Sequence, residues 1–317
     1  MKKGFLLGVL ILLFKNCFCW GFFAHQKINY FAVFLLPPEM IVLFKPNIGF
    51  LSEHSVDPDK RRYAVPEEGP RHFIDIDKSP LKKFKGKLNE APTLSEDTFG
   101  THGILPWWTL KMLKRLTNAF RERDQTRILK LSAEIGHYIS DAYVPLHACH
   151  NYNGQFTDQK GIHAFWESRV PELLADKEWN FFIGRAAYIK DPSKFIWKII
   201  LESAAAADTV LSYEKELGRN VPRDQKFSFE KRNEKIIRQY STAYSIAYNN
   251  KLKGMIERRM RGSIFAIASL WYTAWVNAGQ PDLKKLMNRE MTPEDVLEYQ
   301  NLNSSRQNTV MKGWDCE

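Results

Sequence analysis

The sequence predicts one mostly helical domain, and three observations support this fold class. Apolar residues recur with a period near 3.6, whereas the strict alternation that is typical of half-buried strands is scarce. The chain has 317 residues, of which 44% are hydrophobic, so it can bury one large core. It shows no internal repeat and no low-complexity linker that would divide it. We therefore expect an all-α, single-domain protein; a mainly disordered chain or a small disulfide-stapled scaffold does not fit this composition.

The first residues are typical of an export signal. Lysines follow Met1, and an apolar run covers residues 4–14. This run is too short to span a bilayer, which needs about 20 apolar residues. Cysteines stand at the two positions where a signal peptidase requires small residues. We expect residues 1–19 to be a signal peptide that is cleaved between Cys19 and Trp20, which makes the mature protein secreted or periplasmic.

After the leader, the sequence predicts a domain over residues 20–288 and a polar, frayed tail over residues 289–317, where the apolar period is lost. Helices are expected where the period is clear, and loops where Pro, Asn, Gly and charged residues gather. The expected helices cover residues 107–120, 128–139 and 255–276, and the expected loops cover residues 52–70 and 149–161.

The last of these helices is apolar almost all the way round, so we expect it to be central and buried, ending before Gly279. No second long apolar segment follows the leader, so no transmembrane anchor is expected. Leader cleavage leaves Cys149 and Cys316, which allow one disulfide and give no framework of disulfides.

Histidines and carboxylates gather in the middle of the chain. His137 and Asp141 are four residues apart, so on a helix both side chains project from one face. Pro145 ends or kinks that helix and lets His147 approach from another direction. His163 repeats the four-residue spacing with the glutamate at position 167. The pattern therefore predicts two pairs of ligands with His147 between them.

Imidazole and carboxylate ligands without thiolate are typical of a catalytic zinc site rather than of a structural, cysteine-rich one. The alternative for any single histidine is an ordinary place in the core or on a helix surface. His54, His102 and His150 lie outside the pattern, and we expect them not to be ligands.

The formal net charge of +10 suits phosphate-bearing partners such as nucleic acid or anionic lipid, although a solvated basic surface explains it equally well.

With Trp20 as its new N-terminus, the sequence resembles the zinc-dependent phospholipase C family and its siblings, the single-strand-specific zinc nucleases. The resemblance rests on His-x3-Asp-x5-His followed by His-x3-Glu, on His25 five residues after Trp20, and on the segment His72-Phe73-Ile74-Asp75. It implies the family's fold, a multi-helix domain around a cleft that holds three zinc ions. The residues that match the family's ligands are Trp20, His25, Asp57, His72, His137, Asp141, His147, His163 and Glu167.

The resemblance also implies how these ligands are shared. One zinc would be held by Asp57, His72, His137 and Asp141, and a second by His147, His163 and Glu167. The third would be held by His25 and by the amino nitrogen and carbonyl oxygen of Trp20, with Asp141 as a bridge. Cleavage before Trp20 would create the amine that this site needs. Asp59 is an alternative to Asp57, although the interval to His72 favours Asp57.

Clustered zinc ions hydrolyse phosphodiesters because they neutralise phosphate oxygens and lower the pKa of bound water. Asp57 is the expected group to orient or deprotonate that water. Lys60 would stabilise negative charge that develops in the transition state, and the alternative is that it is a solvated surface lysine. Phe73 would contact the substrate by stacking on a base or by lining a headgroup pocket, the alternative being a core residue.

Some of the remaining sequence features resemble the phospholipases, and others resemble the nucleases. Glu167 as the last ligand resembles the phospholipases, whereas Pro145-Leu146-His147 and Trp166 resemble the nucleases. Pro58 stands where the phospholipases have an aromatic residue. We expect a phospholipase C-like hydrolase that uses zinc-activated water on a phosphodiester substrate. It would have peripheral contact with a membrane surface and no protein partner. The alternatives are a single-strand-specific nuclease or 3'-nucleotidase, and an exported zinc-binding protein without catalysis.

Overall fold

The computed structural model describes residues 21–77, 101–232, 235–286 and 293–308. The expected signal peptide, its cleavage site with Trp20, and Cys316 lie outside the described residues. Within them the chain is mostly helical, and the regular strands form one two-stranded hairpin. The prediction of an all-α fold class is thereby confirmed.

The helices, including short 3₁₀ and π turns labelled η, follow one another along the chain. They are α1 (Phe22–Val33), α2 (Pro38–Phe44), α3 (Ile48–Glu53), η1 (His54–Val56), α4 (Asp57–Arg61), η2 (Pro66–His72), α6 (Leu105–Glu122), α7 (Gln125–Tyr143), η5 (Pro145–Ala148), α8 (Ile162–Ala164), η6 (Phe165–Arg169), α9 (Val170–Leu174), α10 (Pro192–Asn220), α11 (Arg223–Lys226), α12 (Thr242–Lys251), α13 (Met255–Asn277), η7 (Leu283–Leu286) and α14 (Pro293–Asn308). Strands β1 (Phe227–Arg232) and β2 (Lys235–Tyr240) precede α12.

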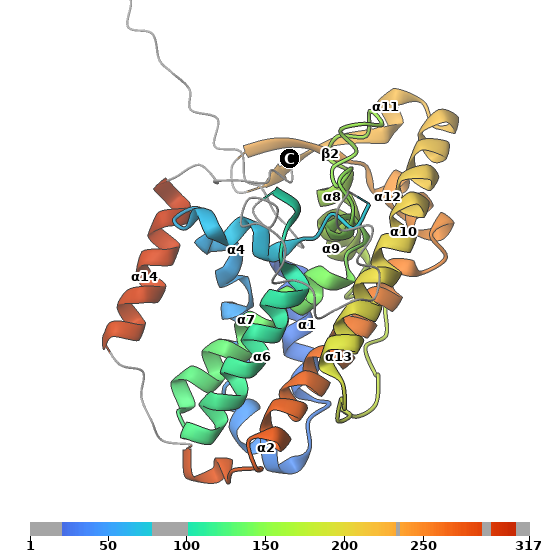
Figure 1. Cartoon of the computed structure of the whole chain (residues 1–317). Helices are drawn as coiled ribbons and strands as arrows, with labels where there is room; N and C mark the ends of the chain where they lie inside the picture. The colour runs from blue at the N-terminus through green and yellow to red at the C-terminus, as the bar shows by residue number, and fades with distance from the viewer. Residues whose placement is uncertain (1–20, 78–100, 233–234, 287–292, 309–317) are drawn as a thin grey trace, which may run out of the picture.

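Four helices, α1, α6, α7 and α13, pack against one another and enclose the core (Figure 1). The predicted helices at 107–120, 128–139 and 255–276 correspond to α6, α7 and α13 and are confirmed. As expected, α13 is central: Ile264, Ile267, Leu270 and Trp271 are fully buried. The Trp271 indole N–H donates to the Ser132 carbonyl of α7 at 3.0 Å, so even its polar atom is satisfied in the core.

A glycine in α7 lets α1 approach closely. A Cβ atom at Gly136 would overlap the side-chain oxygen of Asn29 in α1. The Asn29 amide donates to the carbonyl oxygens of Leu51 and Ala133, both at 3.0 Å, and thereby joins α1 to α3 and α7. Because His25 lies one turn before Asn29, this contact fixes the distance between His25 and α7.

Residues 52–70 differ from the loop that the sequence predicts, because much of this segment forms short helical turns. Pro58 and Pro66 stand in the first turns of α4 and η2. A proline there removes no intrahelical hydrogen bond, and its fixed φ suits the start of a helix. Pro58 and Pro66, which suggested a loop, therefore start helical turns, whereas Pro70 lies inside η2. The expected loop at 149–161, in contrast, consists of turns without a helix.

The expectation of a frayed tail after residue 288 is wrong for residues 293–308, which form α14. This helix packs against α4 and lies at the left edge in Figure 1. Tyr299 is buried against Phe50 and His54, with ring centroids 5.7 Å and 4.0 Å apart. Lys130 forms an ion pair with Glu298. A few contacts therefore hold a helix that is polar over most of its surface.

The sequence analysis did not predict the hairpin. β1 and β2 pair antiparallel, with Phe227 opposite Tyr240 and Arg232 opposite Lys235.

Of the helices in the described residues, none has the length and apolar character of a membrane span.

Candidate metal centre

Three buried groups of histidine and carboxylate side chains lie at the junction of α1, α4, η2, α7, η5, α8 and η6. In each group the ligand atoms lie within 4.8 Å of one another. The groups are His25 with His137 and Asp141, Asp59 with His72 and His137, and His147 with His163 and Glu167. Apart from Trp20, which lies outside the described residues, and Asp57, every ligand that the resemblance implies belongs to one of them.

Helix α7 provides the link between two of the groups. His137 and Asp141 share one face of it, as their spacing predicts. The carboxylate of Asp141 lies between the groups: Oδ1 is 3.5 Å from His25 Nε2, and Oδ2 is 3.0 Å from His72 Nδ1. One carboxylate therefore faces histidines of both groups.

The end of α7 positions the third group. The helix stops at Tyr143, and η5 begins with Pro145 and turns His147 inward, as Pro145 predicts. His163 and Glu167 follow on α8 and η6. The five residues of η6 form a π-helical turn, a local geometry often found at functional sites.

Four of the five histidines are anchored through Nδ1 and turn Nε2 toward their group. The ring N–H donates to a carbonyl oxygen in three of them: His137 to Ser55 at 2.9 Å, His147 to His72 at 2.6 Å, and His163 to Tyr152 at 3.0 Å. His25 Nδ1 lies 3.1 Å from the hydroxyl of Ser140, which itself donates to the Gly136 carbonyl. An anchored imidazole with a fixed orientation is typical of metal-binding histidines.

The inner nitrogens face one another at short range. His147 Nε2 and His163 Nε2 are 3.1 Å apart, and His137 Nε2 is 3.0 Å from His72 Nδ1. Ligand atoms on a tetrahedral ion with bonds of about 2.0 Å are about 3.3 Å apart. Glu167 completes the third group, with Oε2 3.1 Å from His163 Nε2. The spacing of these atoms therefore fits ligands that share an ion.

His72 has the opposite orientation, and a buried glutamate lies behind it. Its Nδ1 faces the group, while Nε2 lies 3.6 Å from Glu68 Oε1. Glu68 also accepts hydrogen bonds from Arg61, Arg71 and Tyr138. Sequence reasoning missed Glu68, although its position four residues before His72 is a signal that could have found it.

The ionisation states of His25, Asp141 and Glu167 suit a cation. Burial lowers the pKa of His25, which keeps the imidazole neutral. Burial alone would raise the pKa of Asp141 and of Glu167, but the neighbouring histidines hold both below their ordinary values. The centre thus combines ionised carboxylates with a neutral ligand imidazole.

The structure places Asp59, and not Asp57, beside His72 and His137. Asp59 Oδ1 lies 3.8 Å from His72 Nδ1 and 3.7 Å from His137 Nε2. Asp57 has both oxygens engaged elsewhere, by His54 Nδ1 at 2.6 Å and by Lys60 Nζ at 2.8 Å. Burial would raise the pKa of Asp57, but the hydrogen bond and charge of His54 and the charge of Lys60 lower it.

Two other predicted site residues have particular surroundings. Lys60 is buried and paired with Asp57, so it is not the solvated lysine of the alternative interpretation. Phe73, the expected substrate contact, is only 3% exposed. A ring with so little accessible surface cannot stack on a base in this conformation, and the core interpretation fits it better.

The histidines expected not to be ligands lie outside the three groups. His102 and His150 both face Asp75, with Nδ1 to Oδ2 distances of 3.7 Å and 3.1 Å. Cys149 is a free, buried cysteine, and burial raises the pKa of its thiol, which disfavours the thiolate.

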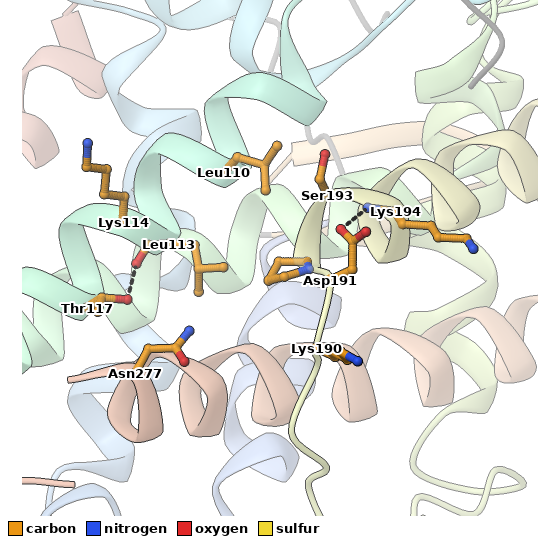
Figure 2. A pocket seen from close by; sticks show the side chains of 10 residues that line it. Leu110, Leu113, Lys114, Thr117, Lys190, Asp191, Ser193, Lys194 and Asn277 are labelled. Carbon is orange, nitrogen blue, oxygen red and sulfur yellow. Dashed lines mark hydrogen bonds between the residues drawn. The ribbon is translucent and has the colours of Figure 1, made fainter. Parts of the chain in front are cut away.

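A separate surface pocket of about 670 Å³ lies between α6, the start of α10 and the end of α13 (Figure 2). The three groups contribute no residue to it. Lys114 and Lys194 line it but point away from each other, so their charges do not converge on one anion. The histidine and carboxylate side chains are concentrated in the three buried groups instead.

Searches against protein-family models and against curated proteins find no match to this chain. The family resemblance therefore rests on the motif residues themselves.

Proposed function

We propose that the chain is a zinc-dependent hydrolase of phosphodiesters, of the phospholipase C kind. The observation that carries this proposal is the set of three adjoining, buried histidine and carboxylate groups. Glu167 is fully buried, and Nε2 of His163 and Nε2 of His147 lie 3.1 Å and 3.5 Å from its Oε2. A buried carboxylate that faces two imidazole nitrogens has the surroundings that a bound cation would use.

The donor set fits zinc. It consists of imidazole nitrogens and carboxylate oxygens, with no thiolate in any of the three groups of the described residues. His147, His163 and Glu167 would hold one ion. Asp59, His72, His137 and Asp141 would hold another, with Asp59 in place of Asp57. His25 and Asp141, together with the expected N-terminal Trp20, would hold the third.

Zinc bound there would neutralise phosphate oxygens and lower the pKa of water toward neutrality. The chain's own residues would provide orientation. The ion pair of Asp57 with Lys60 fixes both side chains on α4, the helix that carries Asp59. Asp57 is the proposed proton acceptor, and Lys60 is the proposed donor toward developing charge.

Export belongs to the same proposal. Cleavage before Trp20 would expose an amine that ligates a metal, whereas an uncut chain has an amide nitrogen there. Processing would therefore complete the centre.

Hydrolysis of bis(p-nitrophenyl) phosphate tests the proposal. We expect the zinc-loaded, processed protein to hydrolyse it, EDTA to abolish turnover and added zinc to restore it. Phosphatidylcholine and single-stranded DNA, assayed in parallel, separate the phospholipase from the nuclease alternative. A zinc-loaded protein that hydrolyses no phosphodiester would instead be a non-catalytic zinc-binding protein.

A further inference from the structure

The β1–β2 hairpin has one face that changes character along its length. The antiparallel register places Phe227, Phe229, Lys231, Ile236, Arg238 and Tyr240 on this face. At its base, Tyr240 stacks on Phe165, with ring centroids 3.8 Å apart, and Phe227 packs on Tyr240. Farther out, Phe229 and Ile236 are each 75% exposed. The base thus belongs to the core, while the outer part presents two large apolar side chains to solvent.

Cationic residues stand directly beside these apolar side chains. Arg238 is the cross-strand partner of Phe229, and Lys231 is the partner of Ile236. Among the described side chains of the hairpin, the acidic one is Glu230, which lies on the opposite face and bonds to Arg169 and Gln239. We call the face formed by Phe229, Lys231, Ile236 and Arg238 the hairpin tip face.

We propose that the hairpin tip face docks on an anionic lipid bilayer. Apolar side chains flanked by lysine and arginine are the composition by which interfacial segments bind such surfaces. The apolar groups enter the headgroup boundary, and the cations meet lipid phosphates. Single-stranded nucleic acid also attracts cations and aromatic rings, but aliphatic Ile236 has no ring on which a base can stack. The pair of Phe229 and Ile236 therefore favours lipid.

The hairpin is attached to the segment that carries two of the candidate ligands. Phe165, on which Tyr240 stacks, lies between His163 and Glu167 in the sequence. Arg169 donates through Nε to the Tyr240 carbonyl at 3.0 Å. The base of the hairpin therefore contacts the segment that carries His163 and Glu167, so a bilayer on the tip face would lie on the hairpin next to this segment. That this brings lipid to a catalytic centre rests on the proposed function, whereas vesicle binding itself does not.

Sedimentation with vesicles tests the proposal on the processed, zinc-loaded chain. We expect binding to vesicles of phosphatidylcholine mixed with phosphatidylglycerol and weaker binding to phosphatidylcholine alone. The double variant Phe229→Ser, Ile236→Ser should bind the mixed vesicles at least about tenfold more weakly. Phe182→Ser is the matched control, because Phe182 is 91% exposed and lies outside the hairpin. It should bind like the wild type.

The charge variant Lys231→Glu, Arg238→Glu should also lose binding, and wild-type binding should weaken as salt is raised. Zinc content, measured for every variant, confirms that the fold is retained. No binding by the wild type, equal binding by the double variant, or an equal loss in Phe182→Ser would overturn the proposal. So would a double variant that loses affinity for single-stranded DNA and not for vesicles. A protein that binds vesicles but hydrolyses nothing would refute only the proposed function.

Discussion

At the scale of single residues, the orientation of the imidazoles is the most informative feature. His137, His147 and His163 each donate one ring N–H to a backbone carbonyl, which leaves the other nitrogen directed at the group. The sequence predicted these residues as ligands but not their anchors, because carbonyl acceptors come from segments far away in the chain. Asp57 and Asp59 illustrate the same limit: two residues on one short helix cannot be distinguished by spacing alone.

The two aspartates make separable predictions. Asp59→Asn should lower the zinc content by about one ion per chain, because it removes a charged ligand beside His72 and His137. Asp57→Asn should keep the zinc and lose at least about 100-fold in phosphodiester turnover, since the proposed proton acceptor is gone. Elemental analysis and turnover of bis(p-nitrophenyl) phosphate check both. Metal loss in Asp57→Asn with normal metal in Asp59→Asn would reverse our assignment.

Glu68 gives a prediction about pH. Burial would raise its pKa, but the hydrogen bond from His72 and the charges of Arg61 and Arg71 hold it well below the ordinary value. A lowered carboxyl pKa stabilises the fold above the unfolded pKa of about 4.3, and this stability is lost as pH falls through the folded pKa. In EDTA, Glu68→Gln should be less stable than the wild type at pH 7 by about 2 kcal/mol.

This difference in the free energy of unfolding should narrow by about 1 kcal/mol between pH 7 and pH 3.5, because only the wild type titrates. Urea unfolding at the two pH values provides the measurement. A difference that stays constant or widens toward acid would contradict the role given to Glu68.

At the scale of elements, three long helices were predicted, whereas the long helix α10 and the marginal elements were not. α6, α7 and α13 carry a sustained apolar period. α14 carries few apolar residues, and its docking depends on contacts such as that of Tyr299 with His54. The hairpin strands are short and rich in charged residues, so their pattern does not stand out from a loop.

The approach of α1 to α7 makes an element-scale prediction. Gly136→Ala should destabilise the protein by about 1–3 kcal/mol, because the added methyl group overlaps Asn29 and overpacks the contact. It should also weaken binding of the zinc that His25 helps to hold, since α1 is pushed away from α7. Gly49→Ala is a control, because a Cβ there meets no atom within 4 Å. Thermal unfolding and zinc titration of both variants make the comparison, and equal behaviour would refute the account of this contact.

At the scale of the whole molecule, one core of packed helices brings candidate ligands from seven elements into one place. The fold class followed from helical periodicity, and His137, Asp141, His163 and Glu167 followed from pairs four residues apart, whereas His25 and His72 were expected only from the family resemblance. The arrangement into three groups did not, because the order of elements in space depends on long-range packing. We propose that this junction binds metal ions.

The zinc content per chain shows whether this junction binds metal ions. The secreted protein is sequenced at its N-terminus and dialysed against metal-free buffer, and its zinc is then measured by elemental mass spectrometry. We predict about three zinc ions per chain, on a protein that begins at Trp20. One ion or none would contradict the account, because the three buried groups would then be a structural network and the proposed hydrolase would have no centre.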